Sequence, residues 1–120
     1  MLDEGQVERI ASRGGVIGLI LAQHQLEDGL TDGEGLAHTV RTLRSHIDEI
    51  HSLAGSYDHI GIGSDLDGFI EPTMPEIGRA EDLSKLVRPL ADHYGPDVAD
   101  AILYRNAARV VRHALAMREA

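Results

Sequence analysis

The chain has 120 residues, of which 42% are hydrophobic and 26% are charged, a composition that is typical of one globular domain and excludes a disordered chain. Its net charge of −9 argues against a nucleic-acid-binding protein, because a protein that binds a duplex needs a basic face. The absence of cysteine excludes disulfides, thiolate metal sites and a cysteine nucleophile.

The first predicted elements are a helix over residues 3–13 and a strand over residues 15–22. Asp3 and Gln6 form a capping box, and Val7 begins a narrow apolar face of the helix. The strand reads GVIGLILA and contains no polar residue. Continuous apolar runs of this length are typical of a strand that is covered on both faces, as in a parallel sheet.

A polar, glycine-rich loop, QHQLEDGLTDGEG, leads to the second predicted helix. Thr31 and Glu34 form another capping box, which predicts a helix over residues 32–54 that ends at Gly55. The apolar residues of this helix recur every three or four positions, so one face is expected to be buried. They are Leu36, Val40, Leu43, Ile47, Ile50 and Leu53.

A second buried strand, HIGIGS, is predicted over residues 59–64. A loop through Pro72 and Pro75 follows it. Three further helices are expected over residues 81–93, 97–104 and 107–118. Asn106 is expected to cap the last of them.

Strands that alternate with helices indicate parallel βα units and an α/β fold. Two strands with apolar residues on both faces need neighbouring strands, because each would otherwise expose an unpaired edge. We therefore interpret residues 1–120 as the C-terminal portion of a single (β/α)₈ TIM-type barrel domain without an internal boundary, since such a barrel takes about 250 residues. The alternative is a small three-layer α/β domain that is completed by homodimerisation.

The second strand runs directly into the polar stretch GSDLDG, residues 63–68. In parallel α/β folds the chemistry lies at the carboxyl ends of the strands, so Asp65 is a candidate metal ligand, general acid/base or substrate anchor. Asp-x-Asp-Gly is also ordinary turn chemistry, and this interpretation is favoured for Asp67.

Two familiar motifs do not fit this stretch. If Gly68 were the invariant glycine of an EF-hand loop, the first and last calcium ligands would fall on Gly63 and Met74, and neither supplies a side-chain oxygen. In GIGSDL the third glycine of a dinucleotide fingerprint would fall on Leu66.

The seven histidines offer one candidate beside Asp65. His24 follows the first strand and could share the edge of the sheet that carries Asp65, although one His and one Asp are too few to bind a metal ion. His59 opens the second strand and should lie at the opposite end from Asp65. His46 and His51 are expected on the second helix, where they lie five residues apart and lack the i, i+4 spacing of a helical zinc pair. His38, His93 and His113 are also expected in helices and should face solvent.

Three segments together resemble one known family. They are RGGVIGLIL at 13–21, HIDEIHSLAGSYDHIGIGSDLDG at 46–68 and YRNAARVVRHAL at 104–115. In this order they resemble the C-terminal third of the membrane (renal) dipeptidase family of zinc peptidases, M19. Arg105-Asn106 stands where the family usually has Gly-Asn, which is a departure from the pattern.

The resemblance implies a (β/α)₈ barrel with two zinc ions at its mouth, which activate a water molecule for attack on a dipeptide carbonyl. It implies that Asp65 is the acid/base that passes a proton to the departing amine. The family's zinc ligands precede the region that matches here, so the resemblance assigns no metal ligand to this chain. The expected protein is a zinc-dependent dipeptidase, and the 120-residue chain alone is expected to bind no catalytic zinc and to be inactive.

Two other functions remain open at the level of sequence. The chain could be a non-catalytic remnant whose sheet edges bind a partner, or part of another metal-dependent hydrolase barrel, in which an Asp after the last strand commonly binds the metal directly. The expected partner is a dipeptide and not a nucleic acid, and a homodimer is the alternative assembly. The acidic N-terminus is unlike a signal peptide, and no apolar run reaches the roughly 20 residues that span a bilayer, so we expect a cytoplasmic protein without a transmembrane segment.

Overall fold

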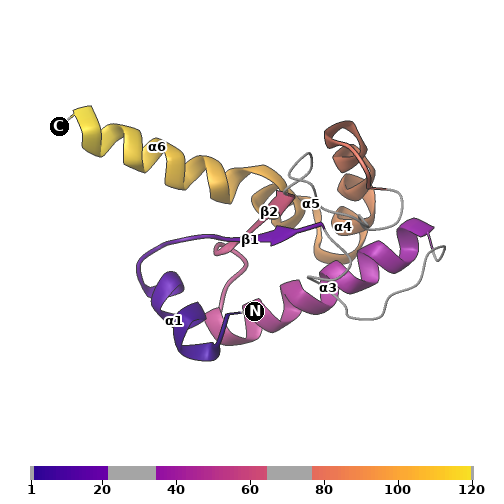
Figure 1. The fold of residues 1–120 in the computed structure, drawn as a ribbon, viewed down its shortest axis with the longest axis horizontal. Coiled ribbons are helices and arrows are strands. Elements are labelled where there is room, and N and C mark those ends of the chain that lie inside the picture. Colours follow the sequence, from indigo (N-terminus) through magenta and orange to yellow (C-terminus); the bar gives the residue numbers. More distant parts are fainter. Residues whose placement is uncertain (1, 22–34, 65–76, 120) are drawn as a thin grey trace.

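The computed structural model describes residues 2–21, 35–64 and 77–119, in which helices and strands alternate (Figure 1). α1 (Glu4–Ser12) precedes β1 (Ile17–Ile20), and α3 (Gly35–Ala54) precedes β2 (Ile60–Ser64). The C-terminal part consists of the 3₁₀ helix η1 (Ala80–Leu86), α4 (Val87–Tyr94), α5 (Pro96–Asp100), the π-helical segment η2 (Ala101–Arg105) and α6 (Asn106–Glu119). The predicted order of helices and strands is confirmed, except that the single helix predicted over 81–93 is divided into η1 and α4.

The first helix begins with the predicted capping box. The Asp3 carboxylate accepts a hydrogen bond from the Gln6 backbone N–H at 2.8 Å, and the Gln6 side chain accepts one from the Asp3 N–H at 2.9 Å. Val7 buries the apolar face of α1 against the core. The second predicted capping box, at Thr31 and Glu34, lies outside the described residues.

The two strands form a parallel pair, as predicted, in which Ile17 pairs with Ile60 and Leu19 with Ile62. β1 is shorter than the predicted 15–22, because the N–H of Gly15 is used to close α1 by donating to the Ile10 carbonyl at 2.9 Å. Helices combined with a parallel two-stranded sheet place the described residues in the α/β class.

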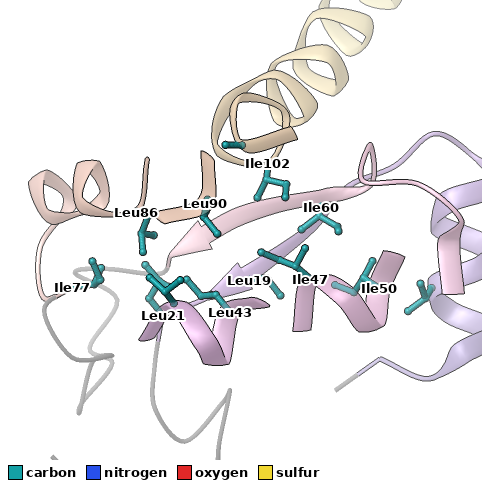
Figure 2. Close-up of a cluster of buried hydrophobic side chains, with 13 residues drawn as sticks. Leu19, Leu21, Leu43, Ile47, Ile50, Ile60, Ile77, Leu86, Leu90 and Ile102 are labelled. Carbon is teal, nitrogen blue, oxygen red and sulfur yellow. The ribbon is translucent and has the colours of Figure 1, made fainter. Parts of the chain in front are cut away.

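The core is aliphatic and lies around the two strands (Figure 2). One stripe of α3 contributes to it, and the C-terminal helices contribute the rest. Each fully buried leucine or isoleucine stabilises the fold by about 1.5–3 kcal/mol relative to an exposed one. The fully buried large aliphatic residues are Leu21, Leu43, Ile47, Ile60, Ile77, Leu86, Leu90 and Ile102.

The last helices differ from the prediction. Instead of separate helices over 97–104 and 107–118, α5, η2 and α6 run on without a break, and the Asn106 N–H donates to the Ala101 carbonyl five residues earlier, the π-helical pattern. The prediction that Asn106 caps α6 is wrong, because Asn106 has helical dihedral angles and is buried at 3% exposure. A capping side chain accepts a hydrogen bond, whereas the Asn106 amide donates hydrogen bonds to the carbonyls of Tyr57 and Ile60.

Candidate active site at the carboxyl edge of the sheet

The carboxyl ends of β1 and β2 lie at the same edge of the sheet, because the strands are parallel. At this edge the Leu21 N–H donates to the Ser64 carbonyl at 3.0 Å. This hydrogen bond holds the carboxyl ends of the two strands together. Asp65 follows Ser64 directly in the sequence. Asp65, Asp67 and His24 themselves lie outside the described residues, so the site is defined here by the strand ends that lead to it.

A β-bulge interrupts the pairing at this edge. Leu19 pairs with Ile62, but Ile20 pairs with Ser64, so Gly63 is an extra residue on β2. Bulges are rare between parallel strands, and they are over-represented beside active sites, where they redirect the residues that follow. The bulge therefore sets the direction of the chain at Ser64, the last described residue before Asp65.

Ser64 adopts a strained backbone conformation at the end of the bulge. Its φ is +44°, and it is the one residue other than glycine with a positive φ among the described residues. This conformation costs an ordinary residue about 1–2 kcal/mol. Strain of this kind persists where the surrounding structure enforces it, and it clusters at functional sites.

The absence of a side chain at Gly18 lets the strands approach closely beside the bulge. A Cβ atom on Gly18 would lie 3.1 Å from the Gly63 Cα and 3.2 Å from its backbone nitrogen, which is too close for an ordinary contact. A Cβ atom on Gly63 would lie 3.4 Å from Gly18, which is an ordinary contact, so the close approach of the strands depends on the glycine at position 18.

At the opposite, amino end of the sheet, Asn106 binds the start of β2. Its Nδ2 donates to the Tyr57 carbonyl at 2.7 Å and to the Ile60 carbonyl at 2.9 Å. Both hydrogen atoms of the amide are therefore used to satisfy backbone carbonyls of a segment that is remote in sequence.

Arg109 and His59 bind further carbonyls at the amino end. Arg109 Nη2 donates to the Gly14 and Asp58 carbonyls, each at 3.1 Å. His59 Nδ1 lies 2.9 Å from the Gly15 carbonyl, and it must be the donor because a carbonyl can only accept. We call Asn106, Arg109 and His59 the amino-end clasp. His59 thus lies at the end opposite to Ser64, as predicted, and its contact is structural.

The roles of Asn106 and Arg109 were missed from the sequence. The sequence predicts that Asn106 caps a helix, and it predicts no role for Arg109. Their partners are backbone carbonyls, which leave no trace in residue type or spacing. Parallel α/β sheets bind their ligands at the carboxyl ends of the strands, and the clasp occupies the opposite end, so the bulged edge is the candidate site.

The other histidines do not converge on a metal site in the described residues. His51 stacks on Tyr57 with ring centroids 4.0 Å apart, and His93 meets Tyr94 edge to face at 4.5 Å. His93 and His113 are exposed as expected, whereas His38 is half-buried. Within residues 2–21, 35–64 and 77–119, no group of three His, Asp or Glu side chains could hold a metal ion.

A tyrosine links α4 to α3. The Tyr94 hydroxyl on α4 donates to Asp48 Oδ1 on α3 at 2.7 Å, and the Tyr94 ring lies 5.3 Å from the Tyr57 ring. Burial, followed by the hydrogen bond to the Asp48 carboxylate, raises the pKa of Tyr94 above its usual range. This contact fastens α4 to α3.

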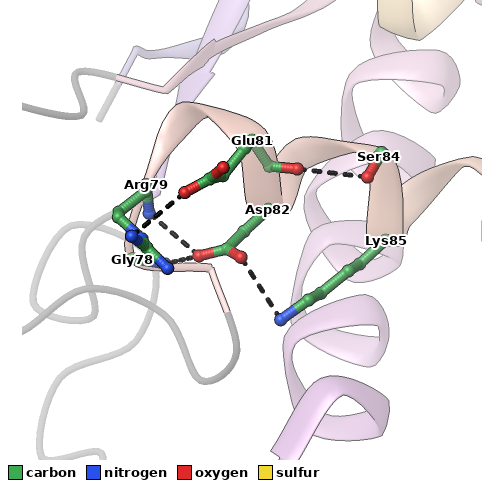
Figure 3. Close-up of polar contacts among 6 residues, drawn as sticks. All are labelled: Gly78, Arg79, Glu81, Asp82, Ser84 and Lys85. Carbon is green, nitrogen blue, oxygen red and sulfur yellow. Dashed lines mark hydrogen bonds and ion pairs between the residues drawn. The ribbon is translucent and has the colours of Figure 1, made fainter.

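A polar cluster holds the chain at the start of η1 (Figure 3). Asp82 Oδ2 accepts hydrogen bonds from the backbone N–H groups of Gly78 and Arg79, each at 3.0 Å, and Lys85 Nζ lies 3.3 Å from Asp82 Oδ1. Ile77, just before this cluster, is fully buried. The cluster and Ile77 together fix the start of η1 against the core.

None of the helices in the described part of the chain is both long enough and apolar enough to cross a membrane. α3 has 20 residues, which is sufficient length, but it carries charged side chains along its course. Its apolar stripe faces the protein core instead.

Comparisons with known proteins identify a family and a relative. A family model described as Membrane dipeptidase (Peptidase family M19) matches residues 1–120. A relative from Klebsiella pneumoniae, named "Uncharacterized protein in pqqA 5'region", is 33% identical over 114 residues, which are 93% of this chain and 40% of the relative. The chain therefore spans less than half the length of this relative.

Proposed function

The chain belongs to the membrane dipeptidase family, Peptidase family M19, and from this premise we propose that it forms part of a zinc-dependent dipeptidase. The proposed fold is a (β/α)₈ barrel to which β1 and β2 contribute two adjacent parallel strands. The observation that carries the proposal is the bulged carboxyl edge, which ends at Ser64 directly before Asp65 in the sequence. Barrels of this type bind their substrates at the carboxyl ends of their strands.

Asp65 is the proposed acid/base of peptide hydrolysis. A carboxylate at the carboxyl end of a barrel strand can accept a proton from the attacking water and donate it to the departing amine. The strained Ser64 and the bulge before it support this role, because a redirected strand end is a common means of aiming a catalytic side chain.

The zinc ions of the family would supply the activated water for this reaction. The described residues do not fit a zinc site, because no three of their His, Asp or Glu side chains lie together. As the family resemblance implies, we propose that the zinc ligands lie outside residues 1–120, and we assign no step of the reaction to a metal-bound group. The part proposed for this chain is proton transfer by Asp65.

The proposal can be tested in a chimera in which residues 1–120 replace the matching stretch of the Klebsiella pneumoniae relative. We expect the zinc-loaded chimera to hydrolyse dipeptides. Asp65→Asn should lower kcat by about 100-fold or more, the usual contribution of a general acid/base, with zinc content unchanged. Asp67→Asn, two residues further on, is the matched control and should retain most of the activity.

A chimera that binds zinc and folds but hydrolyses no dipeptide would contradict the proposed activity. Equal losses in Asp65→Asn and Asp67→Asn would contradict the assignment of Asp65. A loss of zinc in Asp65→Asn would instead identify Asp65 as a metal ligand, as in other metal-dependent hydrolase barrels.

A further inference from the structure

A cavity between α3 and α4 has positively charged side chains in its lining. It has a volume of about 640 Å³, which lies within the range of small-molecule sites. Among the described residues, α3 forms one wall and α4 forms the other, and neither strand contributes to the lining. Ligand binding in this cavity would therefore not depend on the proposed dipeptidase activity.

The α3 wall changes from apolar to basic along the helix. Leu36, Val40 and Arg44 follow one another at intervals of four residues and form one row on the helix surface. Ala37 and Arg41 form the adjacent row with the same interval. Each row thus begins with an aliphatic residue and ends with an arginine.

The α4 wall is held in place beside α3. Pro89, Asp92 and His93 line the cavity, and their spacing of three and four residues places them on one face of α4. Directly after His93, the Tyr94 hydroxyl donates to Asp48 Oδ1 on α3 at 2.7 Å. This hydrogen bond fixes the separation of the two walls, so the cavity is formed before any ligand enters it.

Arg44 carries the feature that indicates a ligand. Its Nε is buried without a hydrogen-bond partner, the one side-chain atom of this kind in the described part of the chain. A buried N–H without an acceptor is costly, and native proteins rarely keep one unless an ion, a water molecule or a ligand satisfies it. The missing partner is a hydrogen-bond acceptor, and the cavity that Arg44 lines has room for one.

The charges of the lining favour a singly charged anion. Arg41 and Arg44 supply two guanidinium groups, which bind carboxylates and phosphates through paired hydrogen bonds. Asp92 also lines the cavity, and it lies 4.0 Å from Arg88 in an exposed ion pair, which is weak. Because Asp92 keeps its negative charge, it would repel a doubly charged phosphate more strongly than a carboxylate.

We propose that this cavity binds a small carboxylate with a short aliphatic body. Arg41 and Arg44 bind the carboxylate, and the aliphatic body packs against Leu36, Val40 and Pro89. The two parts of the ligand match the two ends of the α3 wall, and the carboxylate oxygens supply the acceptor that Arg44 Nε lacks.

Titration calorimetry of the full 120-residue chain with hexanoate tests the proposal. Hexanol has the same kind of body without the charge, and inorganic phosphate has charge without the body. Hexanoate should bind at least about tenfold more tightly than either, because it alone uses both the arginines and the apolar lining. Circular dichroism establishes that the titrated chain is folded, and the chimera described above carries the same cavity for a second titration.

Two variants with the same loss of charge test the role of Arg44. Arg44→Met keeps the aliphatic part of the side chain, and it should weaken hexanoate binding by about tenfold or more. Without ligand it should unfold at the same or a higher urea concentration, because the Nε that it removes has no partner. Arg88→Gln removes a neighbouring charge outside the lining and should change binding by less than about threefold.

A third variant fills the cavity without changing any charge. Ala37 is exposed and lines the apolar end, so Ala37→Leu should leave the fold intact and weaken hexanoate binding. Unchanged hexanoate binding in this variant would contradict the proposed position of the aliphatic body.

The inference would be overturned if hexanoate did not bind to the folded chain, or if hexanol or phosphate bound as tightly. Equal weakening by Arg88→Gln and Arg44→Met would also overturn it, because the effect would then reflect overall charge. A marked loss of ligand-free stability in Arg44→Met would show that this arginine serves the fold instead of a ligand.

Discussion

Asn106 on α6 and Ile60 at the start of β2 lie 46 residues apart in the sequence, yet a buried hydrogen bond of 2.9 Å joins the Asn106 amide to the Ile60 carbonyl. The same amide donates to the Tyr57 carbonyl at 2.7 Å. These two bonds attach the last helix to the amino end of the sheet, which is the end opposite to the bulge at Gly63 and Ser64.

Replacement of Asn106 by aspartate should destabilise the chain strongly. The two side chains have nearly the same size, but an ionised carboxylate only accepts hydrogen bonds and would face two carbonyls in a buried site. We expect the free energy of unfolding to fall by about 2–4 kcal/mol, as measured by urea denaturation. Ala107→Asp, at the exposed neighbouring position, should cost less than about 1 kcal/mol. Similar losses of stability in both variants would show that the two hydrogen bonds of Asn106 are not the cause.

Substitutions of Ser64 should rank by their tolerance of a positive φ. Ser64→Gly removes the steric cost of the backbone conformation at φ +44°, and Ser64→Asn adopts it readily. Ser64→Val should be less stable than Ser64→Gly by about 1–2 kcal/mol, because a β-branched side chain disfavours this conformation most. Thermal unfolding of the three variants would test the ranking. If valine were as stable as glycine, the bulge would not require the strained conformation.

Gly18→Ala should disturb the carboxyl edge. The added methyl group would lie 3.1 Å from the Gly63 Cα, and because both neighbours are backbone atoms of strands, the strands would have to separate. We expect a loss of about 1–3 kcal/mol in the free energy of unfolding. Gly5→Ala is the control of opposite sign, because Gly5 lies in the exposed first turn of α1 and alanine favours the helix by up to about 1 kcal/mol. Equal effects would exclude a close strand contact.

Asp82 should make the stability of the chain depend on pH in the acidic range. Hydrogen bonds from the backbone N–H groups of Gly78 and Arg79, together with Lys85, hold the pKa of Asp82 below its ordinary value of 3.8. The stabilisation is therefore complete above pH 3.8 and is lost as the pH falls through the lower pKa of the folded state.

The stability difference between the unchanged chain and Asp82→Asn should accordingly be largest near neutral pH and disappear in strong acid. Urea denaturation at a series of pH values would measure it, with Glu8→Gln on the exposed surface of α1 as the control. A difference that stays constant down to the acid limit would show that the carboxylate charge is not the cause.

The isolated chain should retain no zinc. Its described residues hold no group of three metal-binding side chains, and the proposed ligands lie outside residues 1–120. After dialysis against zinc-free buffer, we expect elemental analysis to find much less than one zinc ion per chain, and we expect no dipeptide hydrolysis. Retention of one or more zinc ions per chain would contradict the proposed location of the ligands.

The amino-acid sequence by itself determined the order of the elements, the parallel α/β class and the identity of the family. These depend on local signals, such as the capping box at Asp3 and Gln6, the apolar runs of the two strands and the spacing of Leu43, Ile47 and Ile50 along α3. Such signals are local because hydrogen bonding at a helix end and the burial of one helix face act over a few residues.

Only the tertiary structure decided the rest. The bulge at Gly63 depends on which residue of β1 faces which residue of β2, and the clasp depends on carbonyls that every residue possesses, so neither can be found from residue type. The sequence predicts Asn106 as a cap because asparagine commonly caps helices, but its partners are 46 and 49 residues away. Long-range hydrogen bonds to backbone atoms arise only when packing brings the segments together, and this is why the sequence could not show them.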